Sequence, residues 1–155
     1  PPMSHSYRRT SDEPIDLFLV EDNPGDVRLT REAFKAADSE TRLRSVTNGD
    51  DAVELLTREA TGESLTPTDF VLLDLNLPGM DGCEVLETIR ADPQLNHLPV
   101  IMLTSSEADE DIKRCYAANA NAYLTKPNTP DEFRSLVETV EQFWFERVKL
   151  PPVSR

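Results

Sequence analysis

Three short, largely apolar segments constrain the fold of this chain more than any other feature. They cover residues 15–20, 70–75 and 99–104. Apolar runs of this length, bounded by polar or turn-forming residues, are typical of buried strands and are short for helices. A strand that is apolar along its whole length must be covered on both faces, as the central strands of a parallel sheet are. The three segments are therefore predicted to form the middle of such a sheet.

Segments with helical periodicity alternate with these runs. Weaker strands are predicted near residues 43–46 and 122–125, at the edges of the sheet. The predicted helices cover residues 24–37, a segment starting at 49, 83–91, 108–119 and 130–149. Strict alternation of strands and helices indicates an α/β fold, a doubly wound five-stranded parallel sheet with helices on both faces.

A single domain is expected over residues 15–149, with short tails at 1–14 and 150–155, because 155 residues suit one core. No apolar run approaches the length that crosses a bilayer, and the first residues lack the apolar centre of a signal peptide. A cytoplasmic location is the resulting expectation.

The charge balance excludes two classes of ligand. The chain has 29 acidic and 16 basic residues and a formal net charge of −13. Nucleic acids and anionic membranes both attract basic surfaces, so neither is an expected partner. The basic residues are 12 Arg and only 4 Lys. An acidic, lysine-poor composition resembles that of proteins from a salt-rich cytoplasm, which predicts a halophilic source.

The two cysteines, Cys83 and Cys115, lie 32 positions apart and have no C-x-x-C companion. This spacing favours two reduced, small packing residues over a disulfide or a metal site.

Charged or hydroxylic side chains follow four of the five predicted strands. They are Glu21 and Asp22 after the first strand, Asp74 at the end of the third, Thr104 at the end of the fourth, and Lys126 after the fifth. The carboxyl ends of parallel strands meet at one edge of the sheet, where ligands of such folds bind. Each of these residues alone is common in loops, so the prediction of a site depends on their joint placement.

Three clustered carboxylates cannot all stay ionised without a nearby cation. Oxygen ligands of this kind suit Mg²⁺. Aspartate is a known nucleophile in phosphoryl transfer. The sequence therefore predicts a site for a phosphoryl group on a carboxylate, formed by the acidic cluster, a divalent metal, the Lys126 ammonium and the Thr104 hydroxyl.

Four motifs carry a resemblance to a known family. They are LVEDN at 19–23, LLDLNLPGMDG at 72–82, LTS at 103–105 and YLTKP at 123–127. In this order they resemble the receiver domain of two-component response regulators, with the CheY-like fold, over roughly Ile15 to Trp144. The resemblance implies the strand order 2-1-3-4-5.

The resemblance also implies roles for site residues. Asp74 would accept a phosphoryl group from a phosphohistidine of a sensor histidine kinase. Glu21, Asp22 and Asp74 would hold Mg²⁺, and the backbone carbonyl of Asn76 would complete the protein ligands.

Roles for three further residues follow from the same resemblance. Lys126 would neutralise the phosphoryl oxygens, and a cis bond between Lys126 and Pro127 would aim its ammonium. Thr104 would hydrogen-bond the phosphoryl group, and Tyr123 would turn inward as Thr104 moves.

A narrower resemblance concerns the subgroup. Residues 23–29, 115–116 and 143–144 are similar to stand-alone regulators paired with phytochrome-type sensor histidine kinases. Members of that subgroup often pair through the fourth helix, fifth strand and fifth helix. The long last helix and Phe145, which lies off its apolar stripe, therefore predict a homodimer through this face.

The favoured function is a single-domain regulator that signals by protein contact. It would not be an enzyme, although it would catalyse its own phosphorylation and a slow autodephosphorylation. One alternative is a phosphorelay intermediate that passes the phosphoryl group to a histidine phosphotransfer protein. A flavodoxin-like protein that binds an organic phosphate would need a Gly- or Ser/Thr-rich loop where Glu21 and Asp22 stand. A metal-dependent phosphohydrolase would need a second aspartate where Asn76 stands.

Overall fold

A computed structural model describes residues 14–37, 40–62, 68–105 and 108–149, with side chains up to residue 143. Its centre is a five-stranded sheet in the order β2-β1-β3-β4-β5, with every neighbouring pair parallel. The strands are β1 (Ile15–Val20), β2 (Thr41–Val46), β3 (Phe70–Asp74), β4 (Val100–Thr104) and β5 (Ala122–Thr125). The predicted order is confirmed, and the two weaker strands lie at the edges.

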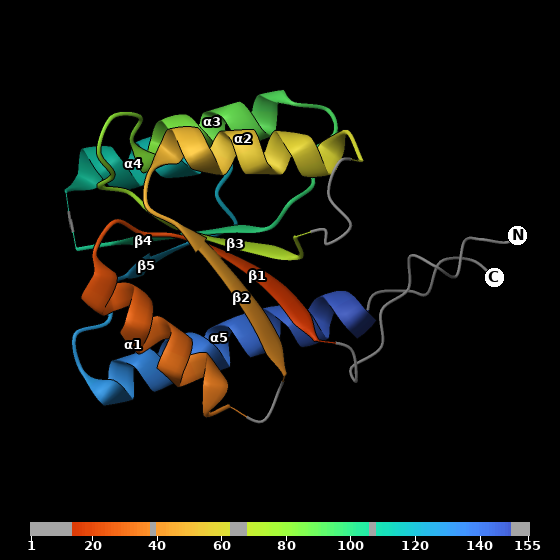
Figure 1. The fold of residues 1–155 in the computed structure, drawn as a ribbon. Helices are drawn as coiled ribbons and strands as arrows, with labels where there is room; N and C mark the ends of the chain where they lie inside the picture. Colours follow the sequence, from red (N-terminus) through yellow and green to blue (C-terminus); the bar gives the residue numbers. More distant parts are fainter. Residues whose placement is uncertain (1–13, 38–39, 63–67, 106–107, 150–155) are drawn as a thin grey trace, which may run out of the picture.

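Five helices cover the sheet on both faces. They are α1 (Pro24–Lys35), α2 (Gly49–Ala60), α3 (Gly82–Ala91), α4 (Asp109–Ala117) and α5 (Pro130–Lys149). Helices α1 and α5 lie on one face, and α2, α3 and α4 lie on the other (Figure 1). Each face has its own apolar core, because the side chains of a central strand point alternately to the two sides.

Most predicted element boundaries agree with the structure to within two residues. The fourth helix is shorter than predicted: it ends at Ala117, and Asn119 has a φ of 68°. A left-handed residue after a helix stops its continuation, and asparagine tolerates that conformation better than most residues. The tails predicted at 1–14 and 150–155 lie almost wholly outside the described residues, and so do the side chains of Trp144 and Phe145.

The register of the sheet brings the carboxyl ends of the strands to one edge. Val20 of β1 pairs with Leu73 of β3, and Asp74 pairs with Leu103 of β4. Thr104 in turn pairs with Thr125 of β5. Residues that follow β1, β3, β4 and β5 therefore emerge side by side, on the left in Figure 1.

The start of α3 packs directly against the end of β3. The backbone N–H of Gly82 donates to the carbonyl of Leu75 at 2.9 Å. A Cβ at position 82 would overlap the carbonyl oxygen of Asp74, so only glycine fits here. Asp81, which precedes it, forms a reciprocal capping box with Glu84. The helix start and the last residue of β3 are thus held in a fixed relation.

Candidate functional site

Three carboxylates meet at the carboxyl edge of the sheet. Glu21 and Asp22 follow β1, and Asp74 is the last residue of β3. One oxygen from each lies within 4.8 Å of the others. Glu21 and Asp74 are each only 2% exposed, whereas Asp22 is exposed. The cluster therefore has a buried floor and one acid open to solvent.

Backbone amides orient the two buried carboxylates. The N–H of Asn23 donates to Oε2 of Glu21 at 3.1 Å. The N–H of Asn76 donates to Oδ1 of Asp74 at 3.2 Å. In each carboxylate, one oxygen thus accepts a hydrogen bond from the loop that follows the residue, and the other oxygen is left for a cation.

Lys126 supplies that cation in this structure. Its backbone N–H donates to the carbonyl of Thr104 at 2.9 Å, which fixes the residue beside the end of β4. Its Nζ lies 2.9 Å from Oε1 of Glu21, 3.3 Å from Oδ2 of Asp74 and 3.1 Å from Oδ2 of Asp26. One ammonium therefore serves three carboxylates from three separate elements.

Asp26 is the site residue that the sequence reasoning missed. It lies in the first turn of α1, where the side chain of the N-cap residue Asn23 accepts its backbone N–H. A helix that begins directly after Glu21 and Asp22 must present its first turn to the same edge of the sheet. This closeness in sequence to Glu21 and Asp22 is the signal that could have identified Asp26 as a site residue, whereas the sequence analysis uses residues 23–29 only to identify the subgroup.

The protonation states reflect burial of acids around a single ammonium. The pKa of Glu21 is raised to about 7. Burial is the main cause, the hydrogen bond from Lys126 acts against it, and the charge of Asp74 adds to the rise. Burial also raises the pKa of Asp74. For Lys126, burial acts to lower the pKa, but the carboxylates of Glu21, Asp74 and Asp26 outweigh it and raise the pKa above its usual value.

The cluster is thus an acidic pocket with too little positive charge of its own. Carboxylate oxygens, two of them buried and one open to solvent, are the donor set that hard divalent cations take. The residues fit a divalent metal ion, which would hold Glu21 and Asp74 in their ionised forms.

The two predicted switch residues lie together on neighbouring strands. Thr104 is 1% exposed at the end of β4, and Tyr123 is half-buried on β5. Burial raises the pKa of the Tyr123 phenol, and a hydrogen bond with Thr104 acts in the opposite direction. The ring of Tyr123 also lies 6.4 Å, centre to centre, from that of Tyr116 on α4.

Two predictions about the backbone have different outcomes. The expected cis bond before Pro127 is wrong, because no peptide bond in the described part of the chain is cis. The trans form of an X–Pro bond is favoured by about 0.5–1 kcal/mol, and Lys126 reaches its three carboxylates with it. Asn76 lies two residues after Asp74, and its carbonyl as a metal ligand remains a prediction.

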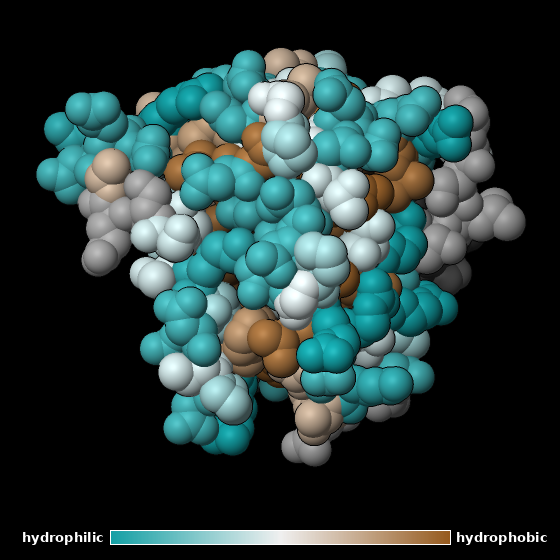
Figure 2. All heavy atoms as spheres, turned by 60° about the vertical axis from the view of Figure 1, so that its left-hand side comes forward, coloured by the Kyte–Doolittle hydropathy of each residue, from teal (hydrophilic) through white to brown (hydrophobic). Residues whose placement is uncertain are grey.

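Figure 2 turns the carboxyl edge of the sheet toward the viewer. This face is hydrophilic over most of its area, and hydrophobic residues appear on it only in small, separate areas. A polar face around a buried charged cluster suits small charged reactants and transient protein contacts better than a permanent apolar interface.

The geometry and the motifs agree with a family model. Residues 17–138 match the response regulator receiver domain, and the chain belongs to that family. Within the described residues, none of the helices combines the length and the apolar character needed to cross a membrane.

The chain is similar to named response regulators, one of which is a phytochrome response regulator. The chain is 36% identical over 141 residues to the response regulator Rcp1 of Synechocystis sp., covering 91% of this chain and 96% of that protein. The crystal structure of the phosphorylated cyanobacterial phytochrome response regulator RcpA matches with a TM-score of 0.79 at 36% identity, over 90% of this chain and 99% of that chain. The Mn²⁺-bound form of Rcp1 matches with a TM-score of 0.77 at 36% identity, over 89% and 99%.

These similarities confirm the predicted family and its likeness to phytochrome-associated regulators. The chain is a response regulator receiver, a signalling protein. The organic-phosphate carrier and the phosphohydrolase that the sequence left open thereby lose their support, since both depended on a different family.

The clustered acids generate a prediction about pH. In a chelating buffer, the free energy of unfolding is expected to fall as the pH rises from about 5 to about 8. The folded pKa of Glu21, about 7, lies above its ordinary value of 4.5, so the folded state keeps a proton that the unfolded state has released. This stabilisation is complete below the unfolded pKa and is lost as the pH passes the folded pKa. The loss is at most about 3 kcal/mol, measured by urea unfolding.

The matched control is Glu21→Gln, in which position 21 cannot titrate; its profile is expected to be less steep, with Asp74 still titrating. Adding Mg²⁺ at pH about 8 is expected to restore stability to the wild type, because an ion that binds only the folded state stabilises it. A wild-type profile that stays flat in chelator over this range would contradict the assignment.

Proposed function

We propose that Asp74 accepts a phosphoryl group from the phosphohistidine of a sensor histidine kinase in an Mg²⁺-dependent reaction. The observation that carries the proposal is the position of Asp74. It is a buried carboxylate with one oxygen held by the Asn76 amide and the other facing the Lys126 ammonium. A carboxylate fixed in this way is pre-oriented for attack on phosphorus.

Bound between Glu21, Asp22 and Asp74, Mg²⁺ would supply the positive charge that stabilises the transferring phosphoryl oxygens. The backbone carbonyl of Asn76 would add a further ligand. The Lys126 ammonium would exchange its contact with Asp74 for one with the new phosphoryl group, while Glu21 and Asp26 keep it at the site. This exchange requires no movement of the backbone, because Lys126 already lies against the accepting oxygen.

Thr104 and Tyr123 would change their contacts when Asp74 is phosphorylated. The buried Thr104 hydroxyl would donate a hydrogen bond to the phosphoryl group and weaken its contact with Tyr123. Tyr123, half-buried beside the exposed Tyr116, would then move relative to α4.

The first prediction of this proposal concerns the phosphoryl acceptor. Acetyl phosphate with Mg²⁺ is expected to add about one phosphoryl group, roughly 80 Da by intact mass, to the wild type. Asp74→Asn is expected to remove the adduct, because an amide is not a nucleophile here. Asp50→Asn, at an exposed position on α2, is the matched control and should keep it. An adduct that persists in Asp74→Asn would overturn the role of Asp74.

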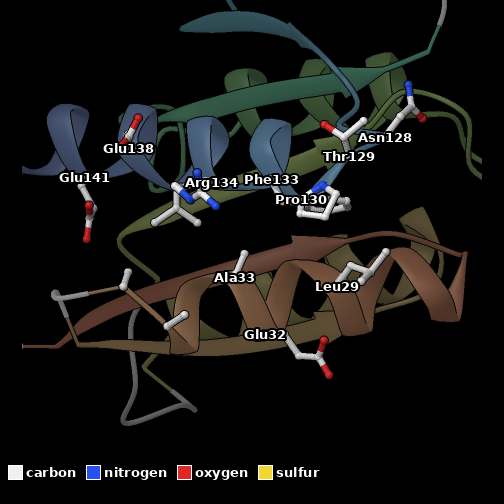
Figure 3. A pocket seen from close by; sticks show the side chains of 13 residues that line it. Leu29, Glu32, Ala33, Asn128, Thr129, Pro130, Phe133, Arg134, Glu138 and Glu141 are labelled. Carbon is white, nitrogen blue, oxygen red and sulfur yellow. The ribbon is translucent and has the colours of Figure 1, made fainter.

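A groove between α1 and α5 is the proposed docking site of the kinase. It has a volume of about 550 Å³. Ala33 and Phe133 are among its lining residues. Asn128 and Thr129, which follow Lys126 closely in the sequence, line it as well. Figure 3 shows Ala33 on the side of α1 that faces α5. A helix lying in this groove would bring its phosphohistidine to the edge that holds Asp74.

The groove generates a second prediction. Leu29, 42% exposed on α1, lines it. Leu29→Arg is expected to slow phosphotransfer from a phytochrome-type histidine kinase that phosphorylates the wild type, by about tenfold for a loss of about 1.4 kcal/mol of contact. Phosphorylation by acetyl phosphate, which needs no docking, should be unchanged.

Thr57→Arg is the matched control, since it places the same charge at an exposed position on α2, across the sheet. It is expected to leave both reactions unchanged. Equal kinase rates for Leu29→Arg and the wild type would remove this surface from the proposal.

The proposed homodimer would form through α4, β5 and α5. Its support is Tyr116, which is 52% exposed on α4 and contacts the ring of Tyr123 on β5. A large exposed aromatic residue is a common centre of protein contacts. We expect size-exclusion chromatography with light scattering to show a dimer with beryllofluoride and Mg²⁺, and a monomer for Tyr116→Asp. A wild type that is monomeric in both states would contradict the dimer.

The remaining parts of the proposal concern context. The receiver domain would span residues 15–149, and the protein would act in the cytoplasm, where its kinase meets ATP. Output would be by protein contact rather than by turnover of a substrate, apart from slow hydrolysis of its own phosphoryl group. Onward transfer to a histidine phosphotransfer protein is the second candidate, since the same acceptor site serves both. The halophilic source remains a prediction from composition.

A further inference from the structure

The two cysteines lie against each other on the face of the sheet that α2, α3 and α4 cover. Cys83 is the second residue of α3 and Cys115 lies near the end of α4. Both are free and fully buried, as the sequence predicted. Their 32-residue separation did not predict that the two Sγ atoms would be 2.8 Å apart.

This separation is shorter than the usual non-bonded contact of two sulfur atoms. A disulfide bond has a length of about 2.05 Å, so only a small further approach would form it. Two thiolates that bind one metal ion stand on different sides of it and lie farther apart. The pair therefore suits a sulfur–sulfur bond rather than a metal site.

Ion pairs between the same helices hold this arrangement. Nη1 of Arg114, which precedes Cys115, lies 3.1 Å from Oδ2 of Asp81, the N-cap residue of α3. Its Nη2 lies 3.6 Å from Oε1 of Glu87 on α3. One side chain of α4, Arg114, thus connects this helix to the start and to the middle of α3 next to the cysteine pair.

Access to the pair requires α4 to open. Burial raises the pKa of Cys83 to about 12 and also raises that of Cys115, so both thiols are protonated and slow to react in the closed fold. However, α4 has only nine residues, and Cys115 is its one buried residue. An element with so few buried contacts opens locally at low cost.

We propose that Cys83 and Cys115 are an oxidation site, at which a hydroperoxide converts the adjacent thiols into an intramolecular disulfide that joins α3 to α4. One sulfur attacks the peroxide oxygen, which gives a sulfenic acid and releases water from hydrogen peroxide. The second sulfur attacks the sulfenic sulfur and releases a second water. Each sulfur gives up one electron, and two thiols plus one peroxide give one disulfide and two waters.

The disulfide would limit the movement of α4 relative to the phosphoryl-acceptor strand. Cys83 follows Gly82, whose backbone packs on Asp74 and bonds to Leu75. A covalent link from this fixed point to Cys115 would hold the end of α4 in place. Oxidation is therefore expected to slow amide hydrogen exchange in α4 and to leave that of α1 unchanged.

The test uses the full chain, reduced with dithiothreitol and then freed of it. The folded protein is treated with hydrogen peroxide, unfolded in guanidinium chloride and labelled with a maleimide. The chain has two cysteines, so the expected result is a loss of both maleimide-reactive thiols, with a tryptic peptide pair linked through Cys83 and Cys115. Dithiothreitol should restore both thiols.

Cys83→Ala and Cys115→Ala provide the controls, since each keeps one thiol and cannot form the internal link. A parallel oxidation of the unfolded wild type shows that the peroxide is active. Two thiols that stay reactive in the folded protein while the unfolded sample loses them would overturn the proposal. Disulfide-linked dimers alone, or sulfinic acids that dithiothreitol does not restore, would overturn it as well. Neither outcome bears on phosphorylation of Asp74, because these assays contain no phosphoryl donor.

Discussion

The contact of one ammonium with three carboxylates is the interaction on which this molecule depends. Lys126 reaches Glu21, Asp26 and Asp74 at once, and these residues come from the end of β1, the first turn of α1 and the end of β3. Water would disperse such a cluster. A rigid sheet edge keeps it together, and burial raises the pKa of Glu21 and of Asp74. Electrostatic strain at the site is thus a product of the fold rather than of any single side chain.

Because of this repulsion between buried carboxylates, the site is sensitive to any charge that is added to it. The cluster has more carboxylates than cations, so an added divalent ion would be bound, and the proposed phosphoryl group would need both that ion and Lys126. The apolar strands make this possible, because their full burial allows no slippage of register that would separate the acids. The face shown in Figure 2 is hydrophilic over most of its area, which keeps it hydrated.

The parts of the structure that could be predicted from the sequence are those that depend on patterns of neighbouring residues. The apolar runs located the strands, and the residues that end them located Glu21, Asp74, Thr104 and Lys126. What could not be predicted depends on distances between side chains of separate elements. Asp26 joins the site through the contact of its carboxylate with Lys126, which follows a different strand. The two cysteines meet because α3 and α4 pack side by side. The trans bond before Pro127 shows that a resemblance does not determine local geometry.

The position of Gly82 connects these features physically. Its lack of a side chain lets the start of α3 touch the backbone of Asp74, and the next residue, Cys83, touches α4 through Cys115. A chain of direct packing contacts therefore leads from the acidic site to Tyr116, which lies beside Cys115 in α4. Because packed interiors are stiff, a change of charge at Asp74 and a change of bonding at Cys83 would act on the same helix. Among the helices, α4 has the fewest buried residues to resist either, with Cys115 alone.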